Sequence, residues 1–204
     1  MKRRPYLSTA RAAEIYNTVV GCRRIFCDDS QFFKATELWE DLCSENNSWR
    51  IKKFRNVDED SYKLKAGVIV FEDLGRVTLT VSDDLWAKAR DGGWMQNFVL
   101  AHELGHIALG HHDKGLVIKN FQVFSGPKGL ANTPPTLEEE EANYAAVFLQ
   151  CGVALEDQRW RTLELSRRAF SDPAYVRKAQ AAVRLDVFQR HLKLIRSKHP
   201  RVVL

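Results

Sequence analysis

Two histidines and a glutamate within residues 102 to 106 are the side chains of this sequence best suited to chemistry. The segment reads His102-Glu103-Leu104-Gly105-His106. On an α-helix, positions i and i+4 lie on the same face, so both imidazoles can bind one divalent metal ion. Glu103 then lies beside the metal, where a carboxylate can take a proton from a bound water. The spacing therefore predicts a zinc hydrolase site.

A catalytic zinc site takes three protein ligands and keeps a fourth position open, so a third ligand must come from elsewhere in the chain. One alternative is a third histidine, because His112 stands at the spacing of the metzincin pattern. That pattern also needs a glycine at the position of Leu109 and a methionine turn downstream. The two methionines, Met1 and Met95, both precede the motif. We therefore disfavour this pattern and expect His111 and His112 to be exposed just past the helix end.

The other alternative is a glutamate from the acidic run at residues 138 to 141. Acidic residues are common in the first turn of a helix, but four carboxylates exceed what a helix cap uses. Glu139 and Asn143 stand four residues apart, so an amide beside a glutamate ligand can accept the spare N–H of a metal-bound histidine. This pairing favours Glu139 as the third ligand, with Glu140 as second choice and Glu141 as third.

Two predicted helices must carry these residues. The mostly apolar stretch at residues 94 to 110 predicts the metal helix. Residues 137 to 151 predict the helix that carries the glutamates, with Thr136 as its N-cap and Gly152 just after its end. The region between the two helices, which includes His112, is poorly patterned.

Further helices are expected on both sides of this pair. The N-terminal segment, residues 8 to 46, predicts two helices, one from Ser8 or Thr9 through about residue 20 and one over about residues 31 to 45. After residue 152 we expect a helix over about residues 155 to 170. A long helix should follow from Asp172 and Pro173, which suit its cap and first turn, to about residue 196.

Residues 51 to 81 predict a small β-sheet. Residues 66 to 71 form a short apolar run, turn residues follow, and residues 76 to 81 alternate with period two, which is typical of a hairpin. A further strand is expected over residues 51 to 54. The fold class should therefore be α+β, with a small, mostly antiparallel sheet packed on the metal helix. We expect the edge strand to lie near Val77 to Val81 and to align an extended substrate.

Length and composition bound the organisation of the chain. With 204 residues, of which 45% are hydrophobic, it can form one compact domain, residues 1 to 152, and a helical C-terminal extension, residues 153 to 204, packed on it. From Glu156 onward there are 12 Lys and Arg against 5 Asp and Glu, so this extension is basic. Nucleic-acid binding through these helices is an alternative that we do not favour over solvated helix faces.

The sequence lacks the run of about 20 apolar residues that a membrane helix needs. Its first residues are charged and are not followed by the apolar core of a signal peptide. We therefore expect a soluble, cytoplasmic protein with no membrane partner.

The two motifs together resemble the ImmA/IrrE family of bacterial and phage zinc metallopeptidases. The resemblance rests on the segment from Ala101 to His111 and on Glu139-Glu-Glu-Ala-Asn143, and it covers roughly residues 67 to 152. It implies a zincin-like fold and a gluzincin-like site in which His102, His106 and Glu139 bind Zn2+. It also implies that Glu103 is the general base.

In function, the resemblance implies an endopeptidase that cuts or inactivates a helix-turn-helix repressor and so regulates transcription in a stress response. The alternative from another class is a regulator that keeps the zincin fold but acts without proteolysis, by binding its protein partner or nucleic acid. The sequence leaves the metal open as well, since histidine and carboxylate ligands accept Zn2+, Mn2+ and other divalent ions.

Overall fold

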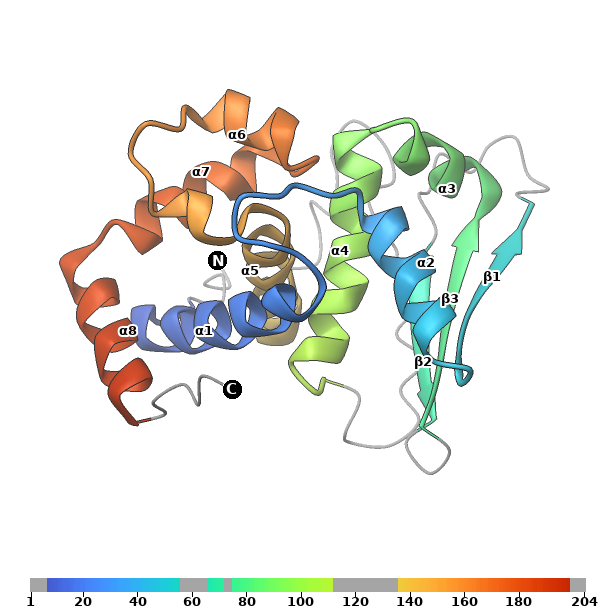
Figure 1. The fold of residues 1–204 in the computed structure, drawn as a ribbon, viewed down its shortest axis with the longest axis horizontal. Coiled ribbons are helices and arrows are strands. Elements are labelled where there is room, and N and C mark those ends of the chain that lie inside the picture. The colour runs from blue at the N-terminus through green and yellow to red at the C-terminus, as the bar shows by residue number, and fades with distance from the viewer. Residues whose placement is uncertain (1–6, 56–65, 72–74, 112–135, 199–204) are drawn as a thin grey trace, which may run out of the picture.

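The computed structural model describes residues 7–55, 66–71, 75–111 and 136–198. Within these ranges the chain forms eight α-helices, one short 3-10 helix and three strands, which confirms the expected α+β class (Figure 1). None of the described helices is long and apolar enough to cross a membrane. The elements in chain order are α1 (Thr9–Phe26), α2 (Ala35–Glu45), β1 (Trp49–Phe54), β2 (Ala66–Phe71), β3 (Arg76–Ser82), α3 (Asp83–Arg90), α4 (Trp94–Ala108), α5 (Leu137–Cys151), η2 (Gly152–Leu155), α6 (Thr162–Arg168), α7 (Pro173–Val183) and α8 (Asp186–Lys198).

The three strands form one mixed sheet with the order β1-β3-β2. The predicted hairpin is confirmed, because β2 pairs antiparallel with β3 and places Ala66 opposite Val81. β1 runs parallel to β3 and places Trp49 opposite Val77. The sheet is therefore not mostly antiparallel, since β2 occupies one side of β3 and β1 joins the other side in the same direction as β3.

This topology corrects the expected position of the edge strand. The segment from Val77 to Val81 lies in β3, which is paired on both sides and is buried at most of its positions. β1 is an edge strand and carries the exposed Lys52 and Lys53, a common protection of sheet edges. Among the described strands β2 is the other edge, and it packs against α4.

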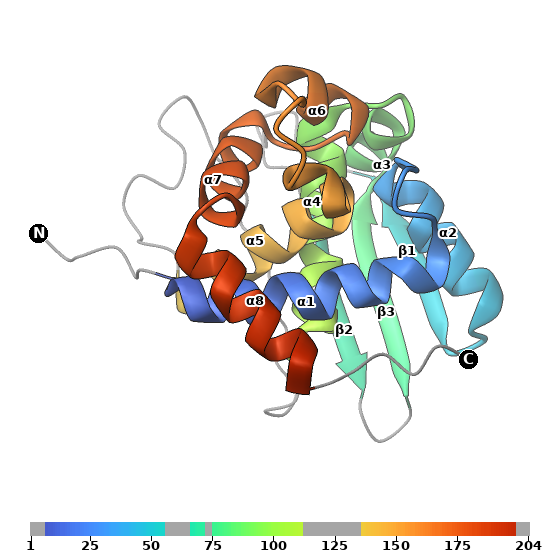
Figure 2. The ribbon, with the colours of Figure 1, turned by 60° about the vertical axis from the view of Figure 1, so that its left-hand side comes forward.

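α4 and α5 form the centre of the molecule and lie side by side (Figures 1 and 2). The ten consecutive residues Asn97 to His106 of α4 are buried, as expected of a helix that is covered on all sides. The two backbones approach closely at Gly105, where a Cβ atom would come within 2.9 Å of both the Ala142 carbonyl oxygen and the Ala145 Cβ. Only a glycine permits this approach, which places the two predicted ligand helices in contact.

The start of α4 is fixed by a buried amide. Asn97 accepts a hydrogen bond from the backbone N–H of Ala35 (2.8 Å) and donates to the carbonyl of Ala89 (2.7 Å). One side chain therefore joins the first turn of α2, the end of α3 and the first turn of α4.

The bounds of several helices differ from those expected. α1 continues to Phe26, beyond the expected end near residue 20, and α2 begins at Ala35 and not near residue 31. The helix expected over residues 155 to 170 is reduced to the short α6, and the expected long C-terminal helix is two helices, α7 and α8. α5 has the predicted bounds, and α4 begins at the predicted residue but ends at Ala108.

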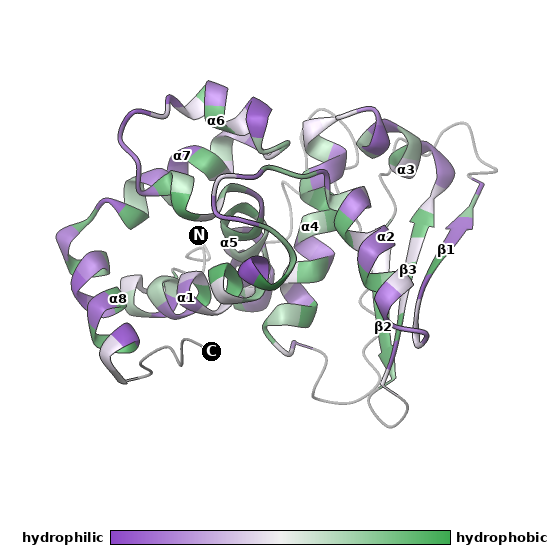
Figure 3. Ribbon diagram, in the orientation of Figure 1, coloured by the Kyte–Doolittle hydropathy of each residue, from purple (hydrophilic) through white to green (hydrophobic). Residues whose placement is uncertain are grey.

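α1, α5 and α8 meet around one aromatic side chain (Figure 2). The ring of Tyr16 on α1 lies edge to face with Phe148 of α5, at 5.0 Å between centroids, and with Phe188 of α8, at 5.7 Å. All three residues belong to the same hydrophobic core as the sheet residues. Figure 3 colours each residue by its hydropathy. The strand β2 is hydrophobic along its length, whereas α6 and α8 carry hydrophilic turns.

Candidate metal centre

His102 and His106 lie one turn apart on α4 and are 1% and 0% exposed. Their Nε2 atoms face each other at 2.9 Å. Two nitrogens bound to one tetrahedral zinc, each at about 2.0 to 2.1 Å, would be about 3.3 Å apart, so this pair is close to the separation that a shared metal requires.

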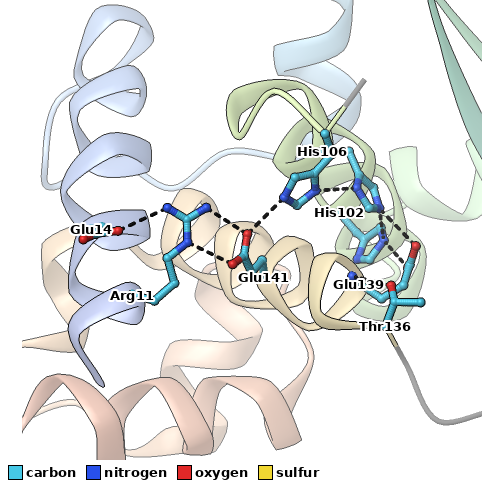
Figure 4. A network of polar contacts seen from close by, with 8 residues as sticks. Arg11, Glu14, His102, His106, Thr136, Glu139 and Glu141 are labelled. Carbon is cyan, nitrogen blue, oxygen red and sulfur yellow. Dashed lines mark hydrogen bonds and ion pairs between the residues drawn. The ribbon is translucent and has the colours of Figure 1, made fainter. Parts of the chain in front are cut away.

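Glu139 comes to the same point from the first turn of α5 (Figure 4). Its Oε2 atom lies 3.2 Å from Nε2 of His102, and its Oε1 atom lies 3.6 Å from Nε2 of His106. The side-chain oxygen of Thr136, the N-cap, accepts from the backbone N–H of Glu139 at 3.3 Å and so fixes this turn. The three side chains form a group whose ligand atoms all lie within 4.8 Å of one another and which could hold a metal ion.

The neighbouring glutamates point elsewhere, because successive residues of a helix are rotated by about 100°. Glu140 lies 3.7 Å from the ammonium of Lys178 on α7. Glu141 forms an ion pair with Arg11 on α1 and contacts His111. Of the three carboxylates that the sequence left open, the structure therefore brings only Glu139 to both histidines.

Asn143 makes the contact that its spacing from Glu139 predicted. Its Oδ1 atom lies 2.9 Å from Nδ1 of His102. An amide oxygen only accepts hydrogen bonds, so Nδ1 of His102 carries the proton and its Nε2 atom has a lone pair. That lone pair faces His106 and Glu139.

His111 corrects an expectation, because it is 9% exposed and not a solvated residue past the helix end. Its Nδ1 atom lies 2.8 Å from Nδ1 of His106. Gly110, with φ of 63°, reverses the chain after α4, and the backbone N–H of His111 then bonds to the carbonyl of His106 at 3.0 Å. The N–H of Gly110 bonds to the carbonyl of Ile107, which completes a Schellman motif. Gly110, which closes the range predicted for this helix, was the available signal for the turn. His112 lies outside the described residues.

The charges of the group favour a cation at its centre. An ionised carboxylate and imidazole lone pairs at this distance repel one another unless a positive charge lies between them. Two imidazoles and one carboxylate are also a ligand set of catalytic zinc sites, so the residues present fit a divalent metal.

Glu103, the predicted general base, lies on α4 directly after His102 and is 1% exposed. An ionisable side chain is costly to bury, and such burial beside other ionisable groups is common at functional sites. The position is therefore consistent with a role in chemistry at the same centre.

A surface depression lies away from this centre. Its volume is about 980 Å³. None of the histidines or glutamates of the metal centre line it, so the chemistry of the side chains and not the size of a hollow locates the candidate site. The lining residues are Phe32, Arg161, Thr162, Leu163, Glu164, Arg167, Arg168 and Phe170.

Comparison of the chain with models of protein families, with curated proteins and with solved structures found no match. Among the described residues, the feature that points to a function is the group formed by His102, His106 and Glu139, which could hold a metal ion.

Proposed function

We propose that this chain is a zinc-dependent endopeptidase of the ImmA/IrrE type, with a metal centre formed by His102, His106 and Glu139. The observation that carries the proposal is the convergence of two buried imidazole nitrogens and one carboxylate from separate helices. This geometry is unlike a chance pair of histidines, because the third donor comes from a segment that is distant in sequence and was expected from its own motif.

The roles of the residues follow from the chemistry of such sites. His102, His106 and Glu139 would hold the zinc ion, and an ion held there would polarise a peptide carbonyl and lower the pKa of a bound water to about 7. Glu103 takes the proton of the attacking water at its carboxylate and returns it to the leaving amine. Asn143 holds His102 in the tautomer that presents Nε2 to the metal.

The strand proposed to align the substrate differs from the one expected from the sequence. β2 replaces the segment from Val77 to Val81 as the strand that aligns the substrate, because in the described residues β2 pairs with β3 alone and packs against α4. An extended peptide can add to such an edge through backbone hydrogen bonds. The class of substrate, a helix-turn-helix repressor in the cytoplasm, rests on the resemblance of the motifs.

The test combines metal analysis with one conservative variant. The purified wild type should contain about one zinc ion per chain and should cleave a helix-turn-helix regulator, for which the product of the adjacent gene is the first candidate, with fragments mapped by mass spectrometry. Glu103→Gln should keep the metal and the thermal midpoint but lose cleavage by at least about 10²-fold, as expected for a general base. His106→Ala should lose the metal as well. Full activity of the Glu103→Gln protein, or a wild type without bound metal, would contradict the proposal.

A second candidate function is a regulator that binds its partner without cutting it. The observation that favours it is the depression beside α6, which is lined by Arg161, Arg167 and Arg168 and by aromatic rings, and which suits an acidic partner. The same Glu103→Gln variant separates the two functions. If it still relieves repression in cells while cleavage is lost, binding and not proteolysis is the activity.

A further inference from the structure

We propose that Arg11, Glu141 and His111 form a relay that holds His106 in the tautomer protonated at Nδ1, so that its Nε2 lone pair is presented to the metal. The inference rests on the metal centre proposed above and assigns positioning roles to three residues outside it. It reaches from α1, through α5, to the turn that follows α4 (Figure 4).

The relay begins with an ion pair across 130 positions of the sequence. Nε and Nη2 of Arg11 each donate to one oxygen of Glu141, both at 2.9 Å. A guanidinium does not lose its proton in proteins, and the two parallel bonds hold the carboxylate in its ionised form. Glu141, whose side chain is 9% exposed, is therefore an acceptor only.

The ionised carboxylate sets the proton positions of the next two residues. Nε2 of His111 lies 3.1 Å from Oε2 of Glu141, and because that oxygen only accepts, the ring nitrogen donates. In neutral His111 the other nitrogen, Nδ1, is then an acceptor. It lies 2.8 Å from Nδ1 of His106, which must donate, and so Nε2 of His106 carries no proton.

This assignment matters because the other tautomer of His106 cannot bind a metal at Nε2. A proton on that atom would point at Nε2 of His102, 2.9 Å away, where the ligand atoms converge. Each ligand histidine thus has its own partner from α5. Asn143 contacts His102 directly, while Glu141 acts on His106 through the intervening ring of His111.

A first measurement tests the relay without any substitution. In the metal-free wild type, long-range proton–nitrogen correlation spectra of nitrogen-15-labelled histidine report which ring nitrogen carries the proton. We expect His106 to be protonated at Nδ1 and His111 at Nε2. A His106 ring protonated at Nε2 in the folded, metal-free protein would overturn the proposal.

A second measurement is the affinity of the purified full chain for Zn2+, by competition with a chromophoric chelator. His111→Phe removes the acceptor for His106 and should weaken binding by about 10- to 100-fold, the usual effect of losing such a partner. His111→Asn should restore most of the affinity, because its side-chain oxygen can stand near the position of ring Nδ1. Glu14→Gln is the matched control, because Glu14 contacts the same guanidinium at 3.2 Å but has no place in the relay.

The outcomes separate this inference from the proposed function. If His111→Phe folds and binds Zn2+ within twofold of the wild type, the relay is wrong even though the metal centre stands. If the wild type binds no Zn2+, the metal centre is wrong, and the tautomers in the metal-free spectra still decide whether the relay exists. If His111→Phe does not fold, a Glu141→Gln protein that is protonated at Nε2 of His106 supports the relay, and one with unchanged tautomers contradicts it.

Discussion

His102 contacts Asn143 of α5 directly, whereas His106 contacts Glu141 of α5 through the ring of His111. The two contacts differ in how far the sequence could predict them. Asn143 was expected beside a metal-bound histidine because it stands one helical turn after Glu139, and the structure shows that this histidine is His102. His111 could not be placed in the same way. Its burial depends on the turn at Gly110 and on Glu141 and Arg11, which come from other helices.

The Arg11 pair should also make stability depend on pH. The hydrogen bonds from Arg11, opposed by burial and aided by His111, lower the pKa of Glu141 below its ordinary value of 4.5. Because the carboxyl group is more acidic in the folded than in the unfolded chain, this contribution is complete above about pH 4.5 and is lost as pH falls through the folded pKa.

We therefore predict that Arg11→Met lowers the free energy of unfolding of the metal-free protein by about 1 to 2 kcal/mol at pH 7. The value is modest because 41% of the Arg11 side chain is exposed. The difference from the wild type should shrink as pH falls from about 4.5 through the lowered pKa of folded Glu141, because the protonated carboxyl group no longer pairs with Arg11 in the wild type. Urea unfolding followed by circular dichroism between pH 7 and pH 3 measures both values. A difference that grows toward low pH would contradict this reasoning.

At the scale of elements, the site depends on how closely α4 and α5 approach. The helix bounds of α5 were predicted because Thr136 and Gly152 are strong local start and stop signals, and both act as expected. The helix contact was not predicted, because it depends on two segments that are distant in sequence. β3 was misplaced at the edge for the same reason, since its second partner, β1, is set by a nonlocal pairing.

Gly105→Ala should separate these two helices. The added methyl group would meet Ala142 and Ala145 at 2.9 Å, and such overpacking costs about 1 to 3 kcal/mol of unfolding free energy. Because the next residue is His106, Zn2+ affinity should fall together with the thermal midpoint. Both are measured on the purified protein by scanning calorimetry and chelator competition.

Gly21→Ala is the matched control on α1. Its added Cβ meets nothing within 4 Å, and the better helix propensity of alanine should stabilise the protein by about 0.5 to 1 kcal/mol. Equal effects of the two substitutions would show that helix propensity and not the contact between α4 and α5 controls the site.

Across the whole molecule, the C-terminal helices share one hydrophobic core with the metal helix. Buried residues of α7 and α8, such as Val176 and Leu192, belong to the same cluster as Leu79 of β3 and Leu100 of α4. α1 runs between α8 and α5, so the element that carries Arg11 is held by the C-terminal extension (Figure 2). The extension was expected from its charge and helical pattern, but its contact with α1 has no signature in local sequence.

We predict that Phe188→Ala destabilises the whole chain and not only α8. Phe188 is fully buried and contacts the ring of Tyr16, so the truncation should cost about 3 to 5 kcal/mol. Thermal unfolding followed by far-ultraviolet circular dichroism and by fluorescence of the five tryptophans, of which Trp39 is fully buried, should shift to the same lower midpoint, as a single cooperative transition requires. Val187→Ala, at a neighbouring position that is 37% exposed, should change stability by no more than about 0.5 kcal/mol. An early loss of helical signal with an unchanged tryptophan transition would mean that the C-terminal helices unfold independently of the metal centre.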